Sequence, residues 1–138
     1  MTTRIAFLGV LFLLAAACTS DEVAVTESPQ SAAETFLALI DQGKYEESWA
    51  EASALLKDNV DAAQWAAHAG GYRQALGSLD HRLLDSIEFQ DSLEDMPAGE
   101  YAFVVFDSTL ADGSSAAEMV GLVLDDDAVW RVIGYHTL

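Results

Sequence analysis

The chain has 138 residues, a length typical of one domain, and its 23 Asp plus Glu against 6 Lys plus Arg give a formal charge of −17. A polyanion gains nothing by releasing the counterions of nucleic acid, and the few basic residues form no cluster, so we expect no nucleic-acid binding. We interpret the negative charge as a means of staying soluble in an acidic or saline habitat. The alternative is that electrostatic repulsion keeps the domain away from anionic lipid.

Residues 1–17 have the pattern of a secretory signal. Arg4 is the only basic residue before an apolar run, residues 5–17, that is too short to span a bilayer but suits the core of a signal peptide. The run ends in Ala15-Ala16-Ala17-Cys18. This looks like a bacterial lipoprotein signal, in which small residues precede a cysteine that is diacylated. The alternative is an ordinary cleavage site that happens to precede a cysteine.

Cys18 is the only cysteine, so it has no disulfide partner within the chain, and acylation gives it a purpose. We therefore expect a protein of the cell envelope that is anchored in the lipid membrane through acylated Cys18. Thr19 is not the Asp that retains such proteins at the inner membrane of enteric bacteria, so we expect the periplasmic face of the outer membrane. Residues 18–30 read as a lipidated cysteine and a flexible tether, and twelve extended residues reach about 40 Å.

The remaining residues, 31–138, are predicted to form a single domain that begins with three helices. Ser31-Ala32-Ala33-Glu34 has the pattern of a capping box, and the helix that follows ends at Gly43. A second helix is predicted from Lys44 to Leu56, with acidic residues in its first turn.

A third helix is predicted to start near Asp61. Its apolar residues keep helical spacing through Gly70-Gly71, which predicts one helix with a weak point instead of two helices. Gly77 is a plausible C-terminal stop.

Four strands are predicted after the helices, and their short connections make them antiparallel. They cover Leu79–Phe89, Tyr101–Leu110, Glu118–Leu124 and Val129–Tyr135. The second strand is apolar on both faces, which is typical of a central strand. In the first strand, Leu79, Leu83, Ile87 and Phe89 are predicted to share one face. Helices followed by strands indicate an α+β fold with the helices on one face of a sheet.

A family resemblance appears in a series of short motifs. They are Ser48-Trp49-x-x-Ala52-Ser53, Trp65, Arg73-x-x-Leu76-Gly77, Gly99-x-Tyr101 and Trp130-Arg131-Val132-x-Gly134-Tyr135. Their order and spacing resemble DUF4019, a family of bacterial domains of unknown function, over nearly all of residues 31–138. The resemblance implies a helix-plus-curved-sheet domain similar to nuclear-transport-factor-2-like and cystatin-like folds. Because the family has no established activity, the resemblance implies no catalytic residues.

Sites for chemistry are scarce in the sequence. His68, His81 and His136 have no second ligand at helical spacing, and the run 125–127 lacks the glycine and the glutamate of a calcium loop. No nucleophile elbow or phosphate loop is present, and acylation would leave no reactive cysteine. The sequence therefore predicts no metal site, no cofactor and no enzymatic activity.

Five residues are candidates for a pocket or for a structural role: Arg73, Trp49, Trp65, Tyr72 and Tyr101. The aromatic residues suit core packing, or alternatively the lining of a pocket between helices and sheet. Arg73 is predicted to clasp the third helix to the sheet; the alternative is a cation at the mouth of a pocket. Two functions follow from these alternatives: a non-catalytic lipoprotein that binds an envelope protein, or a domain that binds a small ligand.

Overall fold

The structure, a computed structural model, describes residues 24–25 and 27–138. The predicted signal, Cys18 and half of the predicted tether lie outside the described residues. Pro29 and Gln30, the last two residues assigned to the tether, belong to the first helix. Along the described chain follow the helices α1 (Pro29–Asp41), α2 (Tyr45–Ala50), α3 (Ala54–Lys57) and α4 (Ala62–Leu76), then the strands β1 (Leu79–Gln90), β2 (Tyr101–Leu110), β3 (Ser115–Leu124) and β4 (Trp130–Thr137).

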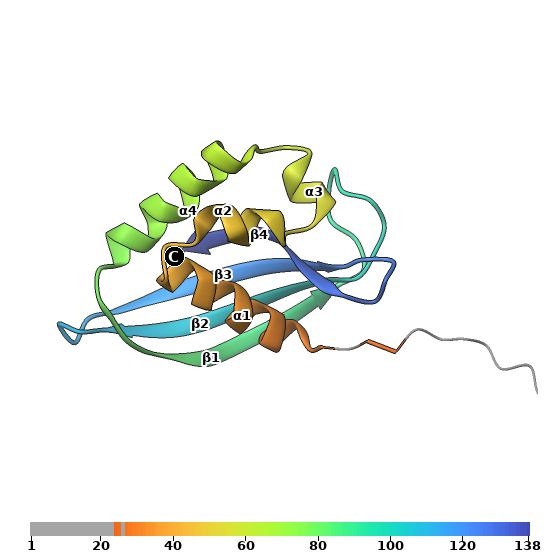
Figure 1. The fold of residues 1–138 in the computed structure, drawn as a ribbon. Coiled ribbons are helices and arrows are strands. Elements are labelled where there is room, and N and C mark those ends of the chain that lie inside the picture. The colour runs from red at the N-terminus through yellow and green to blue at the C-terminus, as the bar shows by residue number, and fades with distance from the viewer. Residues whose placement is uncertain (1–23, 26) are drawn as a thin grey trace, which may run out of the picture.

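The four strands form one antiparallel sheet in the order β1-β2-β3-β4. Figure 1 shows all four helices on the same side of this sheet. The predicted α+β class, with helices on one face of an antiparallel sheet, is confirmed. The central place predicted for the strand of residues 101–110 is also confirmed, since β2 lies between β1 and β3.

The first helix begins earlier than its predicted capping box. The side chain of Ser28 accepts the backbone N–H of Ser31 at 3.1 Å, and Pro29 follows as the first helical residue. Proline suits this position because its missing N–H would have no partner in the first turn and its φ is already helical. Ser31 therefore lies inside α1, and its hydroxyl donates to the carboxylate of Glu27 at 2.7 Å. The prediction of Ser31 as the cap is wrong.

The second predicted helix is two helices, α2 and α3, so the described chain has four helices where three were predicted. The break lies at Ser53, which has an extended backbone and caps α3 by accepting the N–H of Leu55 at 3.3 Å. The N–H of Ser53 donates to the carbonyl of Val132 on β4 at 3.0 Å. This bond to the sheet replaces a helical one, and it fixes α3 against the edge of β4.

Helix α4 starts, continues and stops where it was predicted to, and Asp61 is its cap. Asp61 accepts the N–H of Gln64 at 2.8 Å, and the Gln64 side chain accepts the N–H of Asp61 at 3.0 Å. The helix continues through both glycines, as predicted, and ends at Gly77, whose φ of 80° favours glycine. A Cβ at Gly70 would lie 3.1 Å from the ring of Tyr45, so this glycine lets α4 approach α2 closely.

The four apolar residues predicted to share one face of the first strand do not do so. A bulge between Leu84 and Ser86 separates Leu83, which pairs with Asp107, from Ile87, which packs on the core. The side chain of Leu83 is thereby turned to the opposite face and is 64% exposed. Phe89 is also 64% exposed; it lies beyond the helices and contacts the ring of Trp130 at 6.2 Å between centroids.

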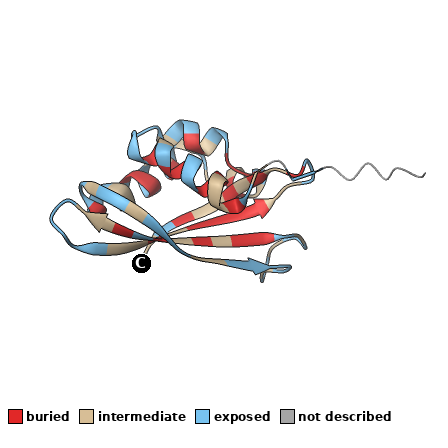
Figure 2. Cartoon of the chain, turned by 90° about the horizontal axis from the view of Figure 1, so that it is seen from below, coloured by how far each residue is buried: buried red, intermediate tan, exposed pale blue. Residues whose placement is uncertain are grey.

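The core lies between the helices and the inner face of the sheet. Figure 2 shows buried residues along the inner strands and on the helical faces, whereas β1 is mostly exposed. Trp65 is central to this core: it is 2% exposed, its ring lies 6.1 Å from that of Phe36, and its Nε1 donates to Ser48 Oγ at 3.0 Å. The ring of Phe36 in turn meets the edge of Tyr135 at 5.7 Å.

We predict that Trp65→Ala lowers the free energy of unfolding by about 3–5 kcal/mol, because it leaves a cavity among these rings. Trp65→Phe keeps most of the packing and loses the bond to Ser48, so it should cost clearly less. Urea denaturation followed by circular dichroism measures both. Equal stability of Trp65→Ala and the parent would contradict the assignment of Trp65 to the core.

Candidate functional site

The two tryptophans of the predicted site are held by the helical layer. Trp65 is buried in the core, as described above. Trp49 is half-buried, and its Nε1 donates to the carbonyl of Val60 at 2.9 Å. The ammonium of Lys57 lies 5.8 Å from the centre of the Trp49 ring, a cation–π distance. These contacts fasten the end of α3 to α2.

The two predicted tyrosines lie in different places. Tyr72, on α4, is half-buried among His68, Tyr135 and His136, with ring centroids 4.7, 6.1 and 5.9 Å away. Tyr101 is buried at the start of β2, on the face of the sheet opposite the core, where its hydroxyl donates to the carbonyl of Pro97 at 2.6 Å. The two rings therefore do not line one pocket.

Arg73 lies near the end of α4 and bonds to the end of another helix. Its Nε donates to Asp41 at 2.9 Å, and its Nη1 donates to the carbonyl of Gly77 at 2.5 Å. Asp41 also accepts two bonds from Arg82 of β1, at 2.5 and 2.9 Å. Arg73 thus reaches the sheet through Asp41, at the C-terminal end of α1.

Arg82 also binds a carboxylate in the core. Its Nε and Nη2 donate to Glu118 of β3 at 2.7 and 3.1 Å. Glu118 is 0% exposed and also accepts bonds from Ser108 and Tyr135, both at 2.6 Å. We call Arg73, Asp41, Arg82 and Glu118, with these two hydroxyls, the ion network.

The ion network keeps its carboxylates charged despite their burial. Burial raises the pKa of Glu118, but the hydrogen bonds from Arg82, Ser108 and Tyr135 outweigh it and hold the pKa below its ordinary value of 4.5. Burial, together with the bond to Glu118, raises the pKa of Tyr135 far above its ordinary range. Four hydrogen bonds engage the Glu118 carboxylate, so it has little capacity left for a substrate.

The sequence interpretation missed Asp41, Arg82 and Glu118. The signal that could have found them was the strand pattern itself: Glu118 alternates with apolar residues that face the core, and a charge at an inward position needs a buried partner. The pattern could not identify that partner, because Arg82 lies 36 residues away in the chain.

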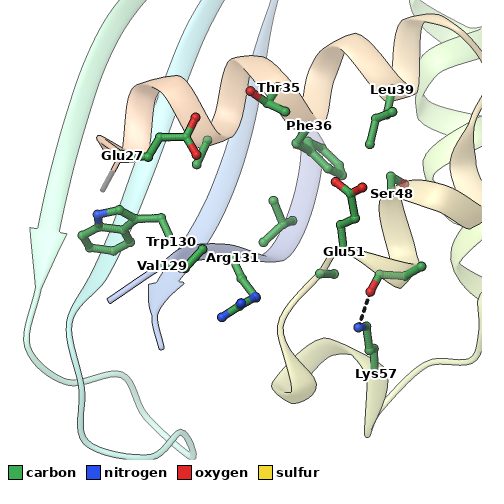
Figure 3. Close-up of a pocket in the computed structure, with 14 residues that line it drawn as sticks. Glu27, Thr35, Phe36, Leu39, Ser48, Glu51, Lys57, Val129, Trp130 and Arg131 are labelled. Carbon is green, nitrogen blue, oxygen red and sulfur yellow. Dashed lines mark hydrogen bonds between the residues drawn. The ribbon is translucent and has the colours of Figure 1, made fainter. Parts of the chain in front are cut away.

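A groove opens between α1, the α2–α3 segment and the start of β4 (Figure 3). We call it the α1–β4 groove; its volume is about 540 Å³. Apolar residues are contributed by α1 and β4, and four charged residues also line the groove: Glu27, Glu51, Lys57 and Arg131. None of the five candidate residues from the sequence lines it.

The two cations of the groove differ in their partners. Arg131 donates to Asp125 at 3.0 Å and to Asp127 at 2.7 and 2.8 Å. Lys57 donates to the carbonyl of Ala50, a bond drawn in Figure 3. Within the described part of the chain, Lys57 is the one Lys or Arg that forms no ion pair. An anionic group in the groove could therefore bind it without displacing a carboxylate.

Residues 24–25 and 27–138 contain neither a cluster of metal ligands nor a membrane-spanning helix. No group of three or more His, Cys, Asp or Glu side chains in these residues is placed to hold a metal ion. No helix of this part is long and apolar enough to cross a membrane.

We predict that Glu118→Gln lowers the free energy of unfolding by about 3–5 kcal/mol near neutral pH, because it leaves the Arg82 charge without its buried partner. Since folding lowers the pKa of Glu118, its ionised form stabilises the fold fully above the unfolded value of 4.5, and this contribution is lost as the pH falls below it. The difference between variant and parent should therefore shrink in acid.

Urea denaturation at neutral pH and between about pH 5 and pH 3 measures this difference. Glu88→Gln, which removes an exposed carboxylate of β1, is the matched control and should change stability little. A difference for Glu118→Gln that stays constant with pH would show that the Glu118 charge is not what stabilises the fold.

Comparison with known proteins confirms the resemblance seen in the motifs. The family described as "Protein of unknown function (DUF4019)" matches residues 32–135. No curated protein matches the chain. The chain is similar to the solved structure of Aln2 from a Streptomyces species, with 15% identity, a TM-score of 0.43 and coverage of 80% of this chain and 91% of that one, a likeness that carries no argument about function. Because the family match spans most of the described domain, the chain belongs to the DUF4019 family.

Proposed function

We propose that the protein is a non-catalytic lipoprotein of the cell envelope, anchored through acylated Cys18, that binds an extended segment of another envelope protein along the free edge of β1. The observation that carries this proposal is the difference between the two edges of the sheet. The apolar run before Cys18 supports the anchor, and the acidic tether would hold the domain clear of the lipid surface.

The β4 edge of the sheet is occupied. The N–H of Ser53 donates to Val132 at 3.0 Å, and the His68 ring nitrogen lies 3.3 Å from the carbonyl of Tyr135. The β1 edge is free: in the part of the chain that the structure describes, no other element bonds to its outward backbone groups. An unpaired edge is a template for adding a strand, and proteins commonly protect such edges.

The second half of β1 offers the best place for an added strand. Residues 86–90 pair with β2 in unbroken register after the bulge, so their outward backbone groups are regularly spaced. Leu84 and Phe89, 40% and 64% exposed, provide apolar contacts, and Asp85 and Glu88 provide exposed carboxylates. This combination suits an extended segment with apolar and basic side chains, because the carboxylates would repel an acidic one.

The hydrogen bonds of the buried polar groups support the proposal that the protein does not catalyse a reaction. Among the described residues, no buried side-chain nitrogen or oxygen lacks a hydrogen-bond partner. Glu118, the most deeply buried carboxylate of the ion network, is held by structural donors from three strands.

A second candidate function is the binding of a small amphiphile in the α1–β4 groove. Lys57, without an ion pair, would bind its anionic group, and the apolar residues of α1 and β4 would contact its tail. This function requires no protein contact at β1, and the cross-linking experiment below therefore separates the two candidates.

We predict that Cys18→Ser moves the protein from the membrane fraction to the soluble fraction of the envelope, because the acylated thiol is lost. Fractionation of cells that make either form, followed by immunoblotting, measures the distribution. A density gradient then assigns the parent to the inner or outer membrane. A Cys18→Ser protein that remains with the membrane would rule out this anchor.

We predict that a photo-cross-linking amino acid in place of Phe89 forms an adduct with another envelope protein in living cells, because this position lies on the proposed binding edge. The same amino acid in place of Gln74, an exposed residue of α4, is the matched control and should form none. Gel electrophoresis and mass spectrometry identify the adducts. Adducts of equal yield from both positions, or none from Phe89, would contradict binding at β1.

A further inference from the structure

Two histidines from distant parts of the chain meet at the edge of the sheet. His68 lies on α4 and His136 lies on β4, the strand at one edge, and their ring centres are 5.8 Å apart. Both side chains are exposed to solvent. Neither histidine belongs to the ion network or lines the α1–β4 groove. The sequence interpretation searched for a second ligand at helical spacing, and such a search cannot find a pair that only the fold brings together.

The ring of His68 is oriented by two contacts. Its Nε2 donates to the carbonyl of Tyr135 at 3.3 Å, and its ring meets that of Tyr72 edge to face, with centres 4.7 Å apart. A carbonyl oxygen can only accept, so Nε2 carries a proton, and Nδ1 of the neutral imidazole keeps a free lone pair. Histidines that bind metals commonly donate their other N–H to a backbone carbonyl, which fixes the tautomer. His68 therefore has the supporting bond of a metal ligand.

The separation of the two imidazoles suits a shared metal ion. With a metal–nitrogen bond of about 2.0–2.1 Å and about 1.2 Å from nitrogen to ring centre, the ion lies about 3.2 Å from each ring centre. Two such rings at the tetrahedral angle have centres about 5.2 Å apart, so His68 and His136 need to approach by only about 0.6 Å. Because both side chains are exposed, a small rotation of either can close this difference.

The electrostatic surroundings favour a cation. The formal charge of −17 attracts positive ions to the surface of the chain. The arginines of α4 and β4 are engaged elsewhere, since Arg73 binds Asp41 and Arg131 binds two aspartates of the preceding turn. A metal ion at the two imidazoles would therefore not displace an existing ion pair of either element.

From these observations we propose that His68 and His136 form a two-histidine site for a divalent transition-metal ion, with water in the remaining positions. Imidazole suits copper, nickel and zinc, and the general order of affinity places Cu²⁺ above Zn²⁺. Mg²⁺ prefers oxygen ligands and should not bind here. Among the described residues no third His, Cys, Asp or Glu completes the set, so the site is open to solvent. The bound ion links α4 to β4.

The test titrates CuCl₂ and ZnCl₂ into the full chain in a calorimeter. The chain is purified in detergent from membranes without a polyhistidine tag, and free thiols are blocked with N-ethylmaleimide. One ion per chain should bind, Cu²⁺ more tightly than Zn²⁺. His68→Gln and His136→Gln should each weaken the affinity at least tenfold, because each leaves a single imidazole. His81→Gln, which removes an exposed histidine of β1, is the matched control and should change the affinity less than twofold.

Two further measurements separate a metal site from adventitious binding. Pulsed electron paramagnetic resonance of the Cu²⁺-loaded parent should show two imidazole ligands. Because the ion binds two elements of the folded chain, Zn²⁺ should raise the melting temperature of the parent and of His81→Gln, but not that of His136→Gln. Without metal, His136→Gln should melt within a few degrees of the parent, because this side chain is exposed.

The proposal is overturned if His136→Gln binds Cu²⁺ as tightly as the parent, or if His81→Gln loses as much affinity. It is also overturned if excess Mg²⁺ displaces the ion, because the binding groups would then be surface carboxylates. If His68→Gln unfolds, the result for His136→Gln decides alone. None of these outcomes depends on Cys18 acylation or on adducts from Phe89.

Discussion

Glu118 is the point on which the architecture depends. It lies on β3 with no solvent exposure and binds a side chain from each of the other three strands: Arg82 of β1, Ser108 of β2 and Tyr135 of β4. A buried carboxylate costs several kcal/mol unless such donors surround it. Only one register of the sheet brings all three donors to the same place, so this charge selects the register, and a slip of any strand would leave it unsatisfied.

The ion network also positions the helices. Arg82 links Glu118 to Asp41 at the end of α1, and Arg73 links Asp41 to α4. The interior beside it is filled by rings, with Phe36 in contact with both Trp65 and Tyr135. The space between helices and sheet is therefore occupied at this end, and the α1–β4 groove remains only where α1 and the start of β4 diverge. The surfaces left as candidates for function are therefore the β1 edge and the α1–β4 groove.

Local signals in the sequence were sufficient for α4, whose cap at Asp61 and stop at Gly77 depend on residues within a few positions of each other. They failed where a distant contact decides the structure. The break at Ser53 exists because its N–H bonds to the last strand of the sheet, and Leu83 changes face because of a bulge that no spacing rule contains. Trp65 lies in the core and Trp49 and Tyr72 pack against it, whereas the groove is lined by other residues. Which inward residues are covered by neighbours depends on how the elements pack, and that information is absent from a single element's pattern.

The basic residues of the described domain show how so acidic a chain remains folded. It has only two lysines and three arginines, and all three arginines, Arg73, Arg82 and Arg131, bind two or more groups of the protein. Arginine suits these positions because its planar fork satisfies several acceptors at once, which a lysine ammonium cannot do with the same geometry. The Arg82–Glu118 pair neutralises a buried charge, whereas the carboxylates that Arg73 and Arg131 bind are partly exposed, and most of the negative charge remains at the surface. Electrostatic repulsion then opposes contacts with acidic partners over most of that surface.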